Sequence, residues 1–159
     1  MGNCCARLCT RSQEEDPYEH STYENTPEWT FEGIRAIVKV LRIVDGDTVD
    51  IVFQHPNSKQ IYRHRVRLYG MDTPEKRPRK DHPQREKEIE ASKLATDALR
   101  QKLKEETFMV LAQFHKKDKY GRELCTFYTS KGDQINEWMI QQGYAEPYDG
   151  GTKTIVIYD

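Results

Sequence analysis

The sequence lacks the features that mark membrane-spanning, secreted and disulfide-rich proteins. No apolar run approaches the roughly 18–20 residues that a membrane-spanning helix needs, and the N-terminus has no apolar stretch typical of a secretory signal peptide. Of the four cysteines, three fall within the first nine residues, and their spacing matches neither a disulfide framework nor a paired zinc motif. These absences favour a reducing compartment and predict a cytoplasmic protein.

Hydrophobic residues are also scarce, which limits the size of the core. They make up 36% of the 159 residues and charged residues 32%, enough for one barrel or α+β domain of about 120 residues and too little for two cores. The net charge of −1 hides an asymmetry, because residues 1–32 hold seven acidic and two basic residues. Residues 33–159 therefore keep 23 basic and 19 acidic residues, a net charge of +4. A mildly basic body suits a partner that carries phosphates.

The sequence pattern changes at Gly33 and divides the chain in two. Residues 1–32 are polar, acidic and poor in aliphatic side chains, which is typical of a flexible leader. Residues 33–159 are predicted to form the folded domain. Its first strand, at about 36–41, is apolar at nearly every position, so we expect it to be buried largely on both faces.

The rest of the domain alternates turns with strands and two helical patterns. The Asp45–Gly46 turn predicts a hairpin, and Pro83 is placed to open a helix. The other predicted elements are strands at about 48–53, 61–69, 108–114 and 124–128, a helix with Ala91, Leu94, Ala95, Ala98, Leu99 and Leu103 on one face, and a short helix at about 133–143. Five short strands with a helix after the third and a short C-terminal helix predict an α+β fold, a closed OB-type barrel.

Three polar turns carry side chains with chemistry of their own, and the first is Asp45-Gly46-Asp47-Thr48. Two carboxylates at a tight turn suit a hard cation, because calcium and magnesium take oxygen ligands. Alone, the motif more often marks a plain turn. It is not an EF-hand loop, because glycine is missing at the sixth position and Pro56 occupies the twelfth.

The second turn follows Arg67 and reads Asp72-Thr73-Pro74-Glu75. A residue before proline avoids the helical region, so the backbone here is extended or turned. That geometry exposes the Thr73 carbonyl as a ligand and aims two carboxylates at one point. The plain alternative is an aspartate cap followed by a glutamate on a solvated loop.

The third turn, at 118–122, follows the fourth predicted strand and ends in Arg122. An arginine fixed at the start of a strand presents a planar fork of donors that matches phosphate oxygens. A surface hairpin with incidental charge would explain this turn on its own. The three turns together, in this order, are far more specific than any one of them.

In order, the three segments resemble the signature blocks of the staphylococcal nuclease family. The blocks read Ile43-Val-Asp-Gly-Asp47-Thr-Val, Arg67-Leu-Tyr-Gly-Met-Asp72-Thr-Pro-Glu75 and Asp118-Lys-Tyr-Gly-Arg122. The likeness extends from about Ile34 to Gly151 and implies a calcium-dependent (Ca2+) nuclease. Such an enzyme hydrolyses DNA and RNA, prefers single strands and leaves 3′-phosphates.

The resemblance also implies a role for each site residue. The implied roles are calcium binding by Asp47, Asp72 and the Thr73 carbonyl, water positioning by Glu75, phosphate binding by Arg67 and Arg122, and contact with the nucleotide by Tyr120 and Tyr148. Two segments depart from the bacterial pattern. Residues 76–87 differ in length and sequence, so substrate preference is expected to differ, and residues 152–159 stand where the bacterial enzyme has a further helix.

The first residues, Met1-Gly2-Asn3-Cys4-Cys5, resemble substrates for dual acylation. Gly2 is the expected myristoylation site, and Cys4 and Cys5 are the expected palmitoylation sites. Two acyl chains anchor a protein stably where one does not, so we expect a monomer held on the cytosolic face of a membrane. The alternative function is a catalytically inactive module, tethered to a membrane, that binds nucleic acid or protein.

Overall fold

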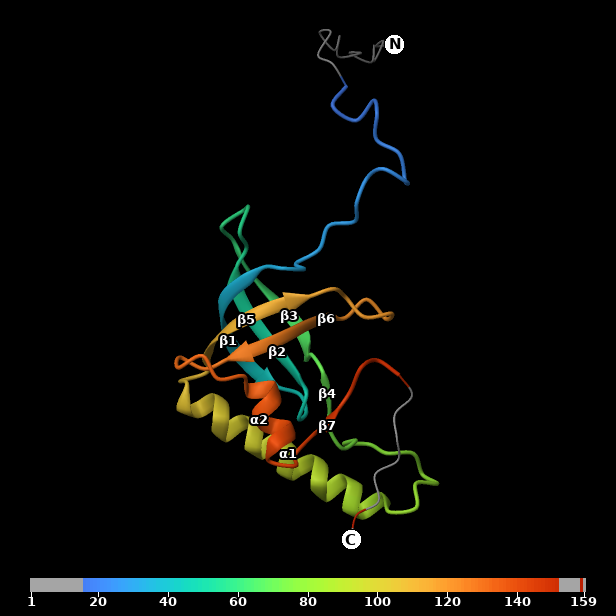
Figure 1. The fold of residues 1–159 in the computed structure, drawn as a ribbon, viewed down its shortest axis with the longest axis vertical. Helices are drawn as coiled ribbons and strands as arrows, with labels where there is room; N and C mark the ends of the chain where they lie inside the picture. Colours follow the sequence, from blue (N-terminus) through green and yellow to red (C-terminus); the bar gives the residue numbers. More distant parts are fainter. Residues whose placement is uncertain (1–15, 152–157, 159) are drawn as a thin grey trace, which may run out of the picture.

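The computed structural model describes residues 16–151 and residue 158, and the chain forms a closed barrel with two helices at one end (Figure 1). The barrel order is β1-β2-β3-β6-β5, with β3 and β6 parallel and the other neighbouring strands antiparallel. The barrel elements are β1 (Arg35–Ile43), β2 (Thr48–Gln54), β3 (Ile61–Leu68), β5 (Met109–His115) and β6 (Glu123–Tyr128). The α+β OB-type fold predicted from the sequence is confirmed.

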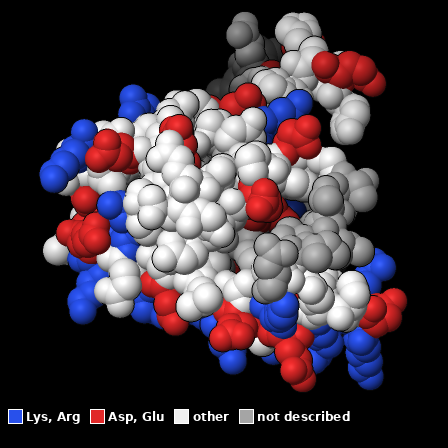
Figure 2. All heavy atoms as spheres, turned by 60° about the horizontal axis from the view of Figure 1, so that its bottom comes forward, with Lys and Arg blue, Asp and Glu red and all other residues white. Residues whose placement is uncertain are grey.

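Four further elements complete the fold. They are the short strands β4 (Met71–Asp72) and β7 (Glu146–Pro147), which pair with each other, and the helices α1 (Arg85–Glu105) and α2 (Ile135–Gln141). Figure 1 shows both helices at the same end of the barrel as β4 and β7. In Figure 2, which brings that end forward, acidic and basic side chains are interspersed around an uncharged centre.

The register of β3 places one arginine between two segments that lie far apart in the sequence. Arg67 is opposite Thr48 of β2 on one side and Leu124 of β6 on the other. On either side of it along the strand, Val66 and Leu68 are completely buried. Since side chains alternate along a strand, the buried pair forces Arg67 to the opposite face.

Strand β1 is not buried on both faces as the sequence suggested. Val38 and Val40 point into the core, whereas Ile37 and Leu41 remain 59% and 53% exposed. In a closed barrel the strand residues alternate between interior and exterior, so β1 needs a cover to bury its outer face. The apolar composition of β1 was therefore a misleading signal for burial.

Helix α1 begins later than predicted and buries a slightly different face. Its first helical residue is Arg85, so Pro83 precedes the helix instead of opening it. Leu94, expected in the buried stripe, is 58% exposed. The buried positions are Glu88, Ser92, Ala95, Leu99 and Leu103. Two polar residues thus occupy the N-terminal half of the stripe, where α1 approaches the β4 segment.

The chain upstream of Gly33 also contributes to the barrel core. Phe31 is 3% exposed, and its ring lies 5.3 Å from the Phe53 ring and 5.2 Å from the Phe114 ring, centroid to centroid. Trp29 stacks on His55 with the ring centroids 5.2 Å apart. The packed structure therefore extends at least to Trp29, while residues 16–28 are exposed and form no helix or strand.

The predicted acylation sites, Gly2, Cys4 and Cys5, lie outside the described residues. The same holds for residues 152–157 and 159 of the C-terminal segment, in which only Tyr158 is described. Within residues 16–151 and 158, no helix combines the length and apolar character needed to cross a membrane.

Candidate active site

Asp47 lies at the junction of the β1–β2 turn with β3 and β4, and it is 3% exposed. Its carboxylate accepts hydrogen bonds from the Thr48 hydroxyl at 2.8 Å and from the Thr73 backbone N–H at 3.4 Å. Its backbone carbonyl accepts a hydrogen bond of 2.7 Å from the N–H of Leu68. The turn is thus tied to the end of β3 and to the segment after β4.

Gly46 permits this close approach. A Cβ atom at position 46 would lie 2.9 Å from Thr73 Cγ2 and 3.0 Å from Ala95 Cβ. Such distances are shorter than normal contacts between carbon atoms, which approach to about 3.5–4.0 Å. The sequence identified Gly46 as a turn residue, and the structure shows that it also makes room for Thr73 and for α1.

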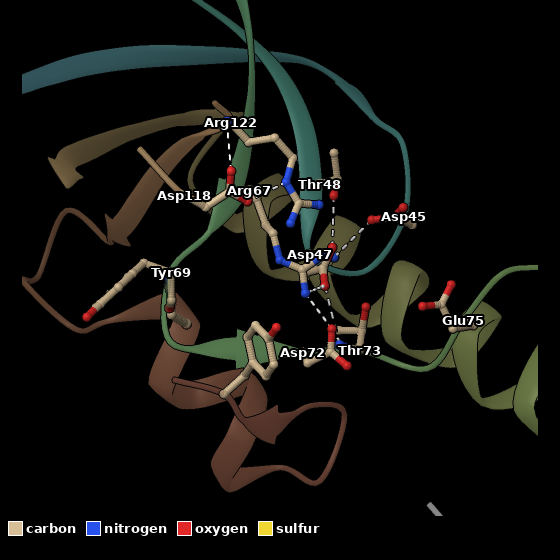
Figure 3. A network of polar contacts seen from close by, with 12 residues as sticks. Asp45, Asp47, Thr48, Arg67, Tyr69, Asp72, Thr73, Glu75, Asp118 and Arg122 are labelled. Atoms are coloured by element: carbon tan, nitrogen blue, oxygen red, sulfur yellow. Dashed lines mark hydrogen bonds and ion pairs between the residues drawn. The ribbon is translucent and has the colours of Figure 1, made fainter. Parts of the chain in front are cut away.

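Arg67 joins the two predicted calcium-binding carboxylates. Its Nη2 lies 2.9 Å from Asp47 Oδ2 and is also hydrogen-bonded to Asp72 Oδ1, and the Arg67 side chain is only 14% exposed (Figure 3). Burial raises the pKa of Asp47 to about 6, even though the positive charge of Arg67 acts to lower it. Burial also acts to lower the pKa of Arg67, but the charges of Asp47 and Asp72 outweigh it and the net shift is upward. The site is therefore a partly desolvated group of mutually dependent charges.

Thr73 and Glu75 follow Asp72 on the same segment. Thr73 is buried, whereas Glu75 is exposed, and Figure 3 shows Glu75 beyond Thr73, on the α1 side of the carboxylates. The backbone N–H of Glu75 donates a hydrogen bond of 2.6 Å to Glu88 of α1. The predicted water-positioning residue thus has an exposed side chain on a backbone that is fixed from the helix.

Arg122 approaches the cluster of Asp47, Arg67 and Asp72 from the 118–122 turn. The Asp118 carboxylate accepts hydrogen bonds from Arg122 Nε at 2.6 Å and from the backbone N–H groups of Arg122 and Tyr120 at 2.9 Å and 2.8 Å. Burial alone would raise the pKa of Asp118, but these hydrogen bonds outweigh it and lower the pKa. Figure 3 shows the Arg122 guanidinium reaching toward Arg67 and Asp47. Asp118 therefore holds the arginine in this direction.

Aromatic rings border the two arginines. The Arg67 guanidinium carbon lies 5.8 Å from the centre of the Tyr148 ring, and that of Arg122 lies 5.4 Å from the centre of the Tyr120 ring. Tyr148 reaches Arg67 because its N–H bonds to the Gly70 carbonyl at 3.0 Å, immediately after the β4–β7 pairing. Both tyrosines singled out in the sequence therefore lie beside an arginine of the site.

Sequence reasoning missed a third tyrosine at the site. Tyr69 is 48% exposed and stacks on His115, with the ring centroids 4.2 Å apart and an interplanar angle of 23°. Its carbonyl is held by the side-chain amide of Asn136 of α2 at 2.9 Å. A signal was available in its position, because Tyr69 directly follows β3 and lies only two residues beyond Arg67.

The donor atoms around Asp47 fit a hard divalent cation. In the described part of the chain, no three or more His, Cys, Asp or Glu side chains are grouped so that they alone could hold a metal ion. The site offers instead the carboxylates of Asp47 and Asp72, which both pair with the Arg67 guanidinium. Thr73 is next to Asp72 in the chain. Calcium takes carboxylate and backbone carbonyl oxygens and completes its shell with water. This all-oxygen set therefore suits calcium.

The comparisons with known proteins agree with this geometry. The sequence model described as staphylococcal nuclease homologue matches residues 65–154. The chain belongs to the staphylococcal nuclease family. The matched segment includes Arg67, Asp72, Glu75 and Arg122, while Asp47 precedes it and is brought to the site by the β2–β3 pairing.

The chain also resembles several curated relatives. It is 27% identical over 111 residues to an uncharacterized endonuclease of Escherichia coli O157:H7, which covers 70% of this chain and 60% of the relative. It is 38% identical over 107 residues to an uncharacterized protein of Bacillus anthracis, covering 67% and 44%. It is 30% identical over 122 residues to endonuclease YhcR of Bacillus subtilis (strain 168), covering 76% and 9%. The chain thus spans 60% or less of the length of these relatives.

Proposed function

We propose that the chain is a calcium-dependent phosphodiesterase that hydrolyses DNA and RNA, prefers single strands and leaves 3′-phosphates. The observation that supports this most is the sharing of the Arg67 guanidinium by the buried Asp47 carboxylate and the partly buried Asp72 carboxylate, with Arg122 directed at the same cluster of charges. Membership of a nuclease family and the names of two endonuclease relatives add to it.

In the proposed reaction the two arginines bind the scissile phosphate. Hydrolysis passes through a phosphorane-like transition state with more negative charge on the phosphoryl oxygens than the substrate carries. Arg67 and Arg122 present donor forks to those oxygens, and donors already in place stabilise the growing charge at little reorganisation cost. Arg122, with its side chain 46% exposed, can exchange part of its pairing with Asp118 for the phosphate.

Glu75 has the role of orienting the attacking water. The Glu75 residue is exposed on the same segment as Asp72, and its backbone is held by a hydrogen bond to Glu88. A carboxylate in that position accepts a hydrogen bond from water and directs the oxygen at phosphorus. Bound at Asp47, Asp72 and the Thr73 carbonyl, calcium would supply Lewis-acid polarisation of a phosphoryl oxygen.

Nucleotide binding is assigned to the aromatic rings around the site. Tyr120 lies beside Arg122 and Tyr148 beside Arg67, and Tyr69, 48% exposed, follows Arg67 by two residues. Stacking on aromatic side chains favours unpaired bases and is tolerant of sequence, because every base has a flat face. Binding through rings and two arginines suits single-stranded substrates better than a paired duplex.

The test is hydrolysis of a single-stranded DNA and a single-stranded RNA oligonucleotide, each with calcium or with EDTA. We expect cleavage only with calcium, and products that end in a 3′-phosphate. Glu75→Gln should cripple turnover while leaving nucleotide binding intact, since a neutral amide accepts the hydrogen bond of the water more weakly than a carboxylate does. Binding of both oligonucleotides without cleavage by the wild-type protein would favour the inactive binding module, and equal cleavage in EDTA would refute the calcium dependence.

We also propose that the protein is anchored on the cytosolic face of a membrane by acylation of Gly2 and of Cys4 or Cys5. The proposal is supported by the sequence motif alone, in which a first acyl chain gives transient binding and a second makes it stable. Cell fractionation tests it. Gly2→Ala should release the protein, and Cys4→Ser with Cys5→Ser should weaken retention, with the nuclease rate in solution unchanged. A wild-type protein found wholly in the soluble fraction refutes the anchor.

A further inference from the structure

Glu88 is a buried acidic residue that the reaction described above does not use. It is 3% exposed and lies in the first turns of α1, facing the segment that carries Glu75. Within residues 16–151 and 158, no lysine or arginine forms an ion pair with it. A buried carboxylate costs stability unless hydrogen bonds satisfy it, so its partners indicate why it is there.

Two donors from distant parts of the chain satisfy Glu88. Its Oε1 accepts a hydrogen bond of 2.6 Å from the backbone N–H of Glu75, and its Oε2 accepts one from the Tyr158 hydroxyl. Both oxygens act as acceptors, as in an ionised carboxylate. Glu88 therefore connects Glu75 to Tyr158, which lies 70 residues further along the chain.

Tyr158 is itself held firmly on α1. Its backbone N–H donates to Gln84 Oε1 at 2.6 Å, and its carbonyl accepts from Gln84 Nε2 at 2.8 Å and from Lys87 Nζ at 3.1 Å. Burial and the neighbouring Glu88 carboxylate raise the pKa of Tyr158, which keeps the hydroxyl protonated as a donor. The Gln84 amide pairs with the tyrosine backbone much as a neighbouring strand would, and the ring then reaches Glu88.

We propose that Glu88 is a positioning residue for Glu75 and that Tyr158 acts as a C-terminal latch that holds Glu88 in place. The proposal rests on the proposed function, because positioning matters only if Glu75 orients water. A charge-assisted hydrogen bond to the backbone fixes where the Glu75 side chain starts. The Glu75 residue itself remains exposed, so the latch restrains the backbone without burying the side chain.

The experiment compares Tyr158→Phe and Glu88→Gln with two matched controls. Tyr23→Phe makes the same change at a tyrosine that is 96% exposed, and Glu90→Gln does so at an exposed glutamate of the same helix. Hydrolysis of a single-stranded DNA oligonucleotide is measured with calcium, under single-turnover conditions for slow variants. Both latch variants should lose about tenfold in kcat with KM unchanged, and the controls should match wild type.

Two readouts separate positioning from general stability. In a Glu75→Gln background the latch variants should cause no further loss of kcat, because they act through Glu75. In addition, amide hydrogen exchange at Glu75, measured without metal or nucleic acid, should become about tenfold faster in Tyr158→Phe and Glu88→Gln and unchanged in the controls.

An unchanged exchange rate at Glu75, or an equal loss of kcat in the Glu75→Gln background, overturns the proposal. Tyr158→Phe keeps it testable if Glu88→Gln does not fold, because removing one hydroxyl leaves the ring and the backbone pairing with Gln84. A wild-type protein that hydrolyses nothing refutes the proposed function, while faster exchange at Glu75 in the same samples still supports the latch.

Discussion

Replacing Arg67 by glutamine removes the guanidinium that Asp47 and Asp72 share, while keeping a polar side chain of moderate length. Asp47 would then be left 3% exposed beside a second carboxylate, with hydrogen bonds from Thr48 and Thr73 but without its cation. We therefore expect a large loss of stability in the absence of calcium.

The size of the loss follows from burial. Removing one partner of a buried ion pair typically costs about 3–5 kcal/mol, and Arg67 keeps 14% of its side chain exposed, which favours the lower end. A loss of about 3 kcal/mol in a domain of this size lowers Tm by roughly 10 °C. The loss should shrink at pH 5, because Asp47, whose pKa burial raises to about 6, then takes up a proton instead.

The assay is thermal unfolding in EDTA at pH 7 and pH 5, repeated with calcium. Calcium should restore part of the stability of Arg67→Gln, because a ligand that binds the folded state stabilises it. Arg65→Gln is the matched control, since Arg65 lies on the same strand, pairs with Asp50 at 2.8 Å and is 60% exposed, so its loss should be much smaller. If Arg67→Gln unfolds at the wild-type temperature in EDTA at pH 7, the assignment of Arg67 as the shared cation is wrong.

Three other substitutions test separate parts of the site. Gly46→Ala should lower the free energy of unfolding by about 1–3 kcal/mol, because its Cβ would lie 2.9 Å from Thr73 Cγ2; an unchanged denaturant midpoint would contradict this packing. Arg122→Lys should reduce kcat by about 100-fold through loss of the donor fork, with Tm nearly unchanged because the side chain is 46% exposed; a near wild-type rate would remove Arg122 from the phosphate site. Asp118→Asn should lower Tm at pH 7 and leave it close to that of the wild type near pH 2. The reason is that the pKa of Asp118 is lower in the folded protein than its unfolded value of 3.8. The ionised carboxylate therefore stabilises the fold above pH 3.8, and this contribution is lost as the pH falls. Equal differences in Tm at both pH values would show that the Asp118 charge is not responsible.

The sequence predicted the barrel well where local pattern and tertiary environment agree. In β3 the alternation of arginines with Val66 and Leu68 matches the observed burial. It predicted burial poorly for Ile37 and Leu94, which are apolar but face outwards. Their exposure depends on which surfaces are covered by other elements, and hydrophobicity alone does not carry that information.

The site was predicted only in part, because a local sequence pattern does not show which distant segments meet. The residues on the three turns could be found because each turn has its own motif, and the order of the turns pointed to the family resemblance that implies their roles. The contacts of Tyr148 and Glu88 could not be found in this way. They depend on the pairing of β4 with β7 and on the docking of α1, which join segments far apart in the sequence.

The arrangement of the charged site depends on the apolar core behind it. Val66 and Leu68 are completely buried on either side of Arg67, and they fix both the face and the register of β3. A shift of one residue in that register would turn Arg67 into the barrel and bring its neighbours out. In the observed register, Arg67 lies opposite Thr48 on one side and Leu124 on the other. Asp47 directly precedes Thr48, and Arg122 precedes Leu124 by two residues, so both lie close to Arg67. The barrel core thus determines that Asp47, Arg67 and Arg122 come together.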